Sequence, residues 1–133
     1  PQTMQIAPSY TDVVAEVRAF FEERLAVAQQ SGIAPARICL DPGIGFGKTT
    51  QHNLELIRHL SSLRVQNCPI MMALSRKRFL GELIADPQLA KTSPLPTVTM
   101  SLLAAENGAN LHRVHDVAPL HHALTLRKTL LHS

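Results

Sequence analysis

Three short apolar runs of the sequence, residues 38–40, 69–74 and 111–115, lead into side chains that can bind or activate a ligand. These are a carboxylate, a hydroxyl, an ammonium, a guanidinium and an imidazole: Asp41, Ser75, Lys77, Arg113 and His115. The ends of parallel strands meet at one edge of a sheet, so we expect the five side chains to share one rim. Any one of them alone fits a satisfied structural polar group, but five together favour a site.

The spacing of these residues suggests which ligand groups they suit. Arg113 and His115 are two apart, so on a strand they share a face and offer two cationic donors to one anion. Ser75 and Lys77 have the same spacing, and a hydroxyl beside an ammonium suits a carboxylate or a heterocycle acceptor. The alternative for the second pair is a solvated basic loop.

The stretch 41–49 has the sequence DPGIGFGKT and ends like a phosphate-binding P-loop. That motif would place its first glycine at Pro42, which has no N–H and a fixed φ, so nucleotide binding by this loop is not expected. Its glycines do allow the backbone, at Gly45 for example, to approach a flat ligand closely. Asp41 would lie at the edge of that ligand and Phe46 would offer a ring. The alternative is a tight strand-to-helix turn capped by Asp41.

Composition excludes several classes of partner. The 133 residues are 45% hydrophobic and 17% charged, which is typical of a folded α/β protein. The net charge is +3, but Lys and Arg are scattered apart from residues 76–78, so no nucleic-acid partner is expected. The seven histidines lack convergent ligand spacing, since His112 and His115 point to opposite sides of a strand, and no metal site is predicted.

The remaining composition signals concern the compartment. Cys39 and Cys68 both lie in apolar runs, which favours two buried, reduced thiols in a cytoplasmic protein. No signal peptide is recognisable at the start of the chain. No apolar run reaches the roughly 20 residues that cross a membrane, so no membrane partner is expected.

The periodicity of apolar residues predicts helices that alternate with the three runs. Strands begin roughly 30 to 40 residues apart, as in βα units with a parallel sheet. Residues 91–96 are predicted to be a loop. Three strands fit either a small three-layer sheet or the last part of a barrel, and periodicity does not decide between them. The predicted helices span 11–30, 53–63, 78–85, 97–107 and 119–131.

Four stretches together resemble dihydropteroate synthases, in order and at suitable spacing: 41–48 (DPGIGFGK), 53–56 (NLEL), 75–81 (SRKRFLG) and 113–117 (RVHDV). Residues 1–5 also resemble the loop after that family's fifth barrel strand. The resemblance implies an α/β fold, a TIM (β/α)₈ barrel, of which residues 1–133 supply about the last three βα units. It implies one pterin-binding domain whose first half is not in these 133 residues, so that they are expected to be inactive alone.

The family's roles carry over residue by residue. Asp41 would accept hydrogen bonds from the pterin, and Lys77 would bind the pterin from the opposite side. Arg113 and His115 would bind the departing pyrophosphate. Gly45, Phe46 and Ser75 complete the expected substrate-binding set, with Phe46 and Ser75 lining the subsite for p-aminobenzoate, where sulfonamides compete.

The resemblance also implies a cofactor, an assembly and a competing function. Mg²⁺ is expected, with its ligand in the absent N-terminal part and none in this chain. A homodimer is expected through the last helices. The competing interpretation is a pterin- or folate-binding barrel without synthase chemistry, of the methyltransferase type. The motifs 75–77 and 113–116 favour the synthase.

Overall fold

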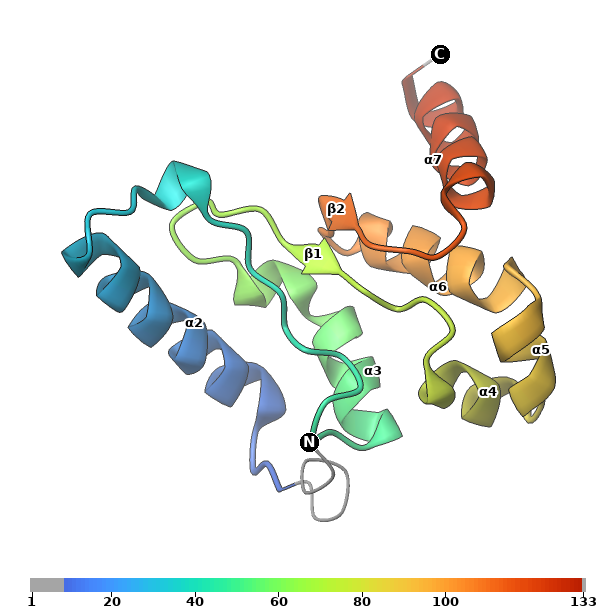
Figure 1. The fold of residues 1–133 in the computed structure, drawn as a ribbon, viewed down its shortest axis with the longest axis horizontal. Helices are drawn as coiled ribbons and strands as arrows, with labels where there is room; N and C mark the ends of the chain where they lie inside the picture. The colour runs from blue at the N-terminus through green and yellow to red at the C-terminus, as the bar shows by residue number, and fades with distance from the viewer. Residues whose placement is uncertain (1–8, 133) are drawn as a thin grey trace.

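The computed structural model describes residues 9–132, so residues 1–5 and their predicted likeness to a barrel loop lie outside the described part. Helices flank a short parallel sheet (Figure 1). In chain order the elements are α2 (Val13–Gln30), η1 (Pro35–Arg37), α3 (Thr50–Arg58), η2 (Leu60–Leu63), β1 (Met71–Met72), α4 (Arg78–Ile84), α5 (Pro87–Thr92), α6 (Leu95–Glu106), β2 (Leu111–His112) and α7 (Val117–His132).

The three apolar runs lie side by side and run parallel, as predicted. β1 pairs with β2 in parallel, with Met71 opposite Leu111, and an isolated parallel bridge joins Leu40 to Ile70. Regular pairing is shorter than the predicted runs. Single backbone bonds extend it, such as the one from Arg113 N to Met72 O at 3.0 Å. The carboxyl ends of all three segments therefore open onto one edge.

Local sequence explains most of the helices. Asp12 caps α2 by accepting from Ala15 N, and the face of α2 that packs inward carries residues at helical spacing. α5 was not predicted. It begins with Asp86 as its cap and a proline in its first turn, where a missing N–H costs nothing. The loop predicted over 91–96 is wrong except at residues 93–94, because α6 accommodates Pro96 in its own first turn.

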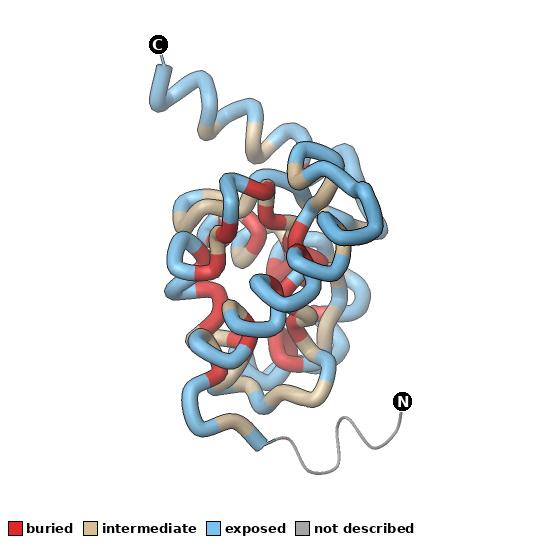
Figure 2. The backbone as a smooth tube through the Cα atoms, turned by 90° about the vertical axis from the view of Figure 1, so that its left-hand side faces the viewer, coloured by how far each residue is buried: buried red, intermediate tan, exposed pale blue. Residues whose placement is uncertain are grey.

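Buried residues gather in the middle of the molecule (Figure 2), and they come from the strand segments and from helices such as α2 and α3. Leu40, Ile70 and Met72 point into this core and are buried. Side chains alternate along a strand, so their neighbours point the other way, and there Cys39 and Leu111 are exposed. The prediction of a buried Cys39 is therefore wrong. Cys68 is buried, as predicted.

The last helix, α7, packs by its first turns near α6 and then projects away from the body (Figure 1). Leu120 is its buried residue, whereas Leu126 and Leu130 are exposed. Within residues 9–132 no helix combines the length and the apolar character needed to cross a bilayer.

Candidate functional site

The glycine-rich stretch after Leu40 forms a tight loop at the carboxyl edge of the sheet. Asp41 Oδ1 accepts the backbone N–H of Gly43 at 2.9 Å, so this carboxylate starts the loop and does not cap a helix. Gly45 has a φ of +87°, which L side chains rarely adopt. Asn53 on α3 is only 2% exposed, and its Oδ1 accepts the backbone N–H of Gly45 at 3.0 Å. The loop is thus held from below by a buried amide.

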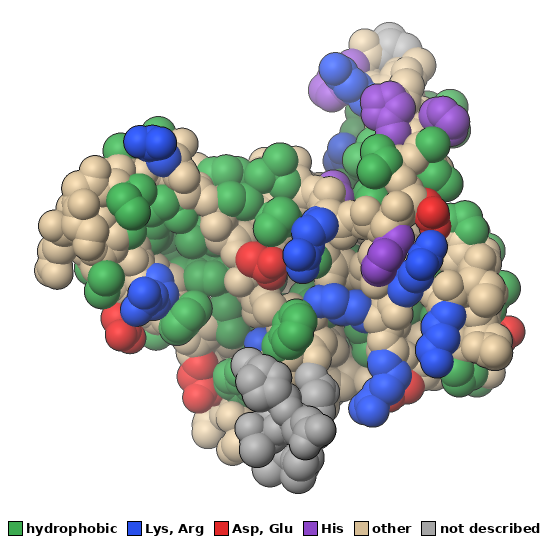
Figure 3. All heavy atoms as spheres, viewed as in Figure 1, with side chains coloured by type: hydrophobic (Ala, Val, Ile, Leu, Met, Phe, Trp, Pro, Cys, Tyr) green, Lys and Arg blue, Asp and Glu red, His purple; other side chains and the backbone are tan. Residues whose placement is uncertain are grey.

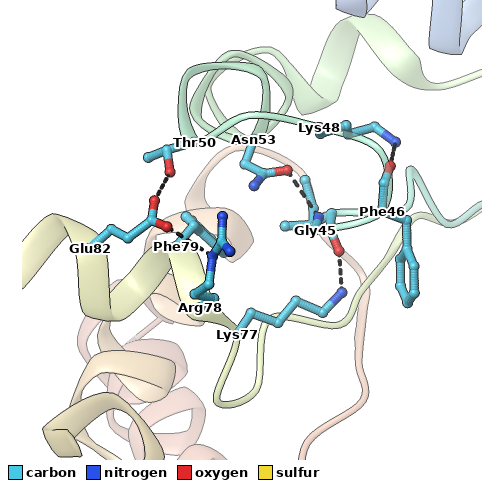
Figure 4. A pocket seen from close by; sticks show the side chains of 10 residues that line it. Gly45, Phe46, Lys48, Thr50, Asn53, Lys77, Arg78, Phe79 and Glu82 are labelled. Carbon is cyan, nitrogen blue, oxygen red and sulfur yellow. Dashed lines mark hydrogen bonds and ion pairs between the residues drawn. The ribbon is translucent and has the colours of Figure 1, made fainter. Parts of the chain in front are cut away.

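Two lysines close this loop from opposite sides (Figure 4). Lys77 Nζ donates to the carbonyl oxygen of Ile44 and lies 4.8 Å from the centre of the Phe46 ring. Lys48 Nζ donates to the carbonyl oxygen of Phe46 at 3.0 Å. The Phe46 ring itself remains 49% exposed. The Lys77 ammonium therefore stands next to a half-exposed aromatic ring, whereas the Lys48 ammonium binds the backbone of the same residue.

The loops after β1 and β2 are joined by two parallel links. Ser75 Oγ lies 2.6 Å from His115 Nδ1 and also accepts the backbone N–H of His115 at 3.1 Å. Beside it, Arg76 Nη2 and Asp116 Oδ2 form an ion pair at 3.0 Å. Arg76 has a φ of +58°, so the chain turns here and is not extended as predicted. That turn sends Lys77 toward the glycine loop while Ser75 stays with His115.

The predicted residues line three adjoining hollows. Lys77 borders a hollow of about 310 Å³ together with Ser75, Arg113 and His115. It also borders one of about 320 Å³ with Gly45 and Phe46. Asp41 lines a third hollow of about 480 Å³, next to α2. Phe46 lines both this hollow and the second one. The site is thus a row of hollows, and Lys77 borders two of them. We had expected the five side chains to meet at one rim around a single opening.

The face that carries this row is basic. Figure 3 shows Lys and Arg side chains gathered over the centre and right of the molecule, where the loops after β1 and β2 lie. Such a surface favours an anionic ligand.

Residues 1–115 match the sequence model of the family described as "Pterin binding enzyme". The chain belongs to this family. It is 45% identical over 118 residues to the dihydropteroate synthase of Neisseria meningitidis serogroup C, covering 88% of this chain and 41% of the relative. It also superposes on the dihydropteroate synthase of Xanthomonas albilineans in complex with 7,8-dihydropteroate, with a TM-score of 0.88 and 43% identity. That match covers 95% of this chain and 48% of the other.

This member of the pterin-binding family also resembles a second solved structure, the Thermus thermophilus dihydropteroate synthase in complex with 6HMPPP. The TM-score is 0.87 at 41% identity, over 98% of this chain and 51% of the other. The chain thus spans about half the length of these relatives.

Burial is the largest influence on the pKa values of Lys77 and Lys48. Burial lowers the pKa of Lys77, Asp41 raises it in part, and Arg113 and Lys48 lower it further. Burial also lowers the pKa of Lys48, against an opposing effect of Asp41. Lys77, which follows the second strand segment, is therefore affected by charges that follow or end the other two segments. This places the carboxylate, the ammonium and the guanidinium in one electrostatic neighbourhood.

Sequence reasoning gave no role to several residues of this region. Lys48 and Asn53 support the glycine loop, and the hollow next to Gly45 is also lined by Arg78, Thr50 and Glu82. Glu82 pairs with Arg78 at 2.9 Å and accepts from the Thr50 hydroxyl, which ties α4 to α3. A buried Asn in an otherwise apolar helical face was the signal available for Asn53, because a buried amide needs partners.

No metal centre forms within the part of the chain that the structure describes. Among residues 9–132 no three His, Cys, Asp or Glu side chains are grouped so that they could hold a metal ion. A Mg²⁺ ion held by three or more such side chains therefore has no site among these residues.

Proposed function

We propose that this chain belongs to a dihydropteroate synthase, a transferase. The enzyme would condense 6-hydroxymethyl-7,8-dihydropterin pyrophosphate with p-aminobenzoate, giving 7,8-dihydropteroate and pyrophosphate for folate synthesis. The observation that carries the proposal is the position of Lys77 between Asp41 and the Arg113–His115 hollow. Solved relatives are named with bound 7,8-dihydropteroate and 4-aminobenzoic acid.

The pterin would lie between Asp41 and Lys77. Asp41 uses one oxygen for the N–H of Gly43, and a carboxylate has further lone pairs that can accept from the amino-pyrimidine edge. Lys77 uses one N–H for the carbonyl of Ile44, and an ammonium has two more to donate. The site therefore offers an acceptor and a donor on opposite sides of a flat ring.

The leaving pyrophosphate would bind to Arg113 and His115. Both residues are exposed at the rim and line the same hollow as Lys77. Negative charge builds on the pyrophosphate as its bond to the pterin methylene breaks. Fixed donors at that point lower the barrier directly. The arylamine nitrogen then forms a bond to the methylene carbon that pyrophosphate has left, and the nitrogen loses a proton.

The arylamine would occupy the space beside Phe46. Its half-exposed ring, with the Lys77 ammonium over it, supports stacking of an aromatic acid there. Gly45 allows the close approach of backbone to ligand. Ser75 lines the neighbouring hollow with Arg113 and His115, and its place in the arylamine subsite remains a prediction. One relative, from Yersinia pestis, is named in a sulfonamide drug complex, which fits competition at this subsite.

The remaining parts of the proposal concern the whole protein. We propose that residues 1–133 are the C-terminal part of one pterin-binding domain and supply about the last three βα units of a TIM barrel. The exposed sheet face at Cys39 and Leu111 supports a missing layer of barrel strands. A Mg²⁺ ligand outside this chain, a cytoplasmic location and a homodimer remain predictions. The exposed Leu126 and Leu130 of α7 are compatible with the homodimer.

Lys77→Ala in the full-length protein tests the proposal. Loss of a preorganised charged donor should lower kcat/KM for dihydropteroate formation by roughly 10²–10³-fold. Lys91→Ala is the matched control, since Lys91 is an exposed lysine on α5 away from the three hollows. Wild-type turnover by Lys77→Ala would refute the assignment.

Calorimetry separates the synthase from a barrel that only binds pterins. The synthase should bind p-aminobenzoate once its other ligand is present, either pterin pyrophosphate itself or a mixture of pterin and pyrophosphate. A binding barrel of the methyltransferase type should take the pterin and give no heat with p-aminobenzoate.

A further inference from the structure

The hydroxyl oxygen of Ser75 contacts two polar atoms of a single residue, His115. Its Oγ accepts the backbone N–H of His115 at 3.1 Å and lies 2.6 Å from the ring Nδ1 of the same residue. The two bonds hold both the backbone and the ring of His115. Because the ring is tied at Nδ1, its other nitrogen, Nε2, is the atom left for a ligand.

The hollow beside His115 carries positive charge. Lys77 and Arg113 line it, and no carboxylate is among the lining residues. The nearby Arg76 and Asp116 are paired with one another. The hollow therefore suits an anion, to which a ring N–H of His115 can donate.

The hydroxyl of Ser75 then selects the tautomer. A hydroxyl has one hydrogen to donate, and within the described residues Ser75 Oγ makes only the two contacts with His115. If Nδ1 accepts that hydrogen, every polar atom of the pair is used. The proton of the neutral ring must then be on Nε2. In the opposite tautomer the Ser75 hydrogen would find no acceptor among the described residues, and Nε2 would present a lone pair to an anion.

We propose that Ser75 is a positioning residue which selects the Nε2–H tautomer of the neutral His115 ring, so that the imidazole presents an N–H donor to a pyrophosphate or phosphate anion. This inference rests on the proposed function for the identity of the anion. It differs from the predicted role of Ser75 as a lining residue of the arylamine subsite, because its hydroxyl is committed to His115.

The tautomer can be read directly from ¹⁵N chemical shifts of the imidazole in the full-length protein, with His115→Gln to assign the signals. At pH 7.5 wild type should show a protonated Nε2 and an unprotonated Nδ1. Ser75→Ala should give a mixture of tautomers, and Ser75→Thr should restore the wild-type pattern because it keeps the hydroxyl. Inorganic pyrophosphate should bind roughly tenfold more weakly to Ser75→Ala and normally to Ser75→Thr, as expected for one lost hydrogen bond to a charged group.

Asp116→Asn is the matched control. It weakens the neighbouring link between the same two loops and leaves the Ser75 contacts intact, so His115 should keep its wild-type spectrum. A wild-type ring protonated on Nδ1, or an unchanged tautomer in Ser75→Ala, would overturn the proposal. An equal spectral change in Asp116→Asn would also overturn it, since the effect would then belong to the loops and not to Ser75.

The two levels of inference fail separately. The spectra and pyrophosphate binding do not depend on turnover. If the wild-type protein makes no dihydropteroate but shows the expected spectra and affinities, the synthase proposal fails and the role of Ser75 stands. If the wild-type protein makes dihydropteroate but Ser75→Ala leaves the spectrum unchanged, the synthase proposal stands and the role of Ser75 fails.

Discussion

Gly45 is the position where one added methyl group should disturb Lys77. Its φ is +87°, and a Cβ there would lie 3.2 Å from Cδ of Lys77. Gly32, just after α2, has a φ of +86°, but no heavy atom of the described residues lies within 4 Å of an added Cβ. Alanine at either position therefore carries similar backbone strain, and the two variants differ in the contact with Lys77.

The magnitudes follow from this comparison. A left-handed alanine costs roughly 1–2 kcal/mol, so both variants should unfold at similarly lowered urea concentrations. In Gly45→Ala, Lys77 must also give way by a few tenths of an ångström. Since a 1 Å misplacement costs on the order of a hundredfold in rate, we expect about a four- to tenfold lower kcat/KM. Gly32→Ala should keep its kcat/KM.

The assay is dihydropteroate formation by the full-length protein, with urea unfolding of the same samples. The reasoning is refuted if Gly45→Ala loses stability as expected but retains wild-type kcat/KM. It is equally refuted if Gly32→Ala loses as much activity as Gly45→Ala, because strain alone would then explain both.

Two further predictions concern stability. Gly81→Ala should destabilise the protein by about 1–3 kcal/mol, because the new Cβ would lie 2.8 Å from the backbone Cα of Pro87; an unchanged urea midpoint would contradict this packing. Burial lowers the pKa of His112, whose Nδ1 has no hydrogen-bond partner among the described residues. The unfolded chain therefore protonates first as the pH falls, so stability should be greatest above the ordinary histidine pKa of 6.5 and decline below it until the folded pKa is passed. His112→Leu should flatten that decline in urea titrations at several pH values, and an unaltered decline would argue against it.

Local patterns were sufficient to predict most of the helices and the parallel order of the three strand segments. Helix α2 illustrates why: its buried residues recur at helical spacing and its cap is the adjacent Asp12, so all the information lies within one segment. α5 was missed because Pro87 and the prolines after it suggest a loop. Prolines are in fact compatible with the first turn of a helix, which is where Pro87 and Pro96 fall.

The chemical character of the site was also visible in the sequence, because the residue types at the strand ends are set by the chain itself. The exposure of Cys39 was not, since apolar neighbours do not reveal whether another layer covers a strand. Whether the site residues open onto one hollow or onto several likewise needed coordinates. Asp41 and the Arg113–His115 pair line different hollows, although Asp41 and Arg113 both affect the pKa of Lys77.

The sequence by itself determined which groups stand at the ends of the parallel strands, and therefore that a basic rim would form. Only the tertiary structure decided how those groups pair. The left-handed turn at Arg76 sends Lys77 to the glycine loop and leaves Ser75 with His115, 40 residues away along the chain. Hydrogen bonds depend on directions and distances between segments, and those arise only when the segments pack against a common core.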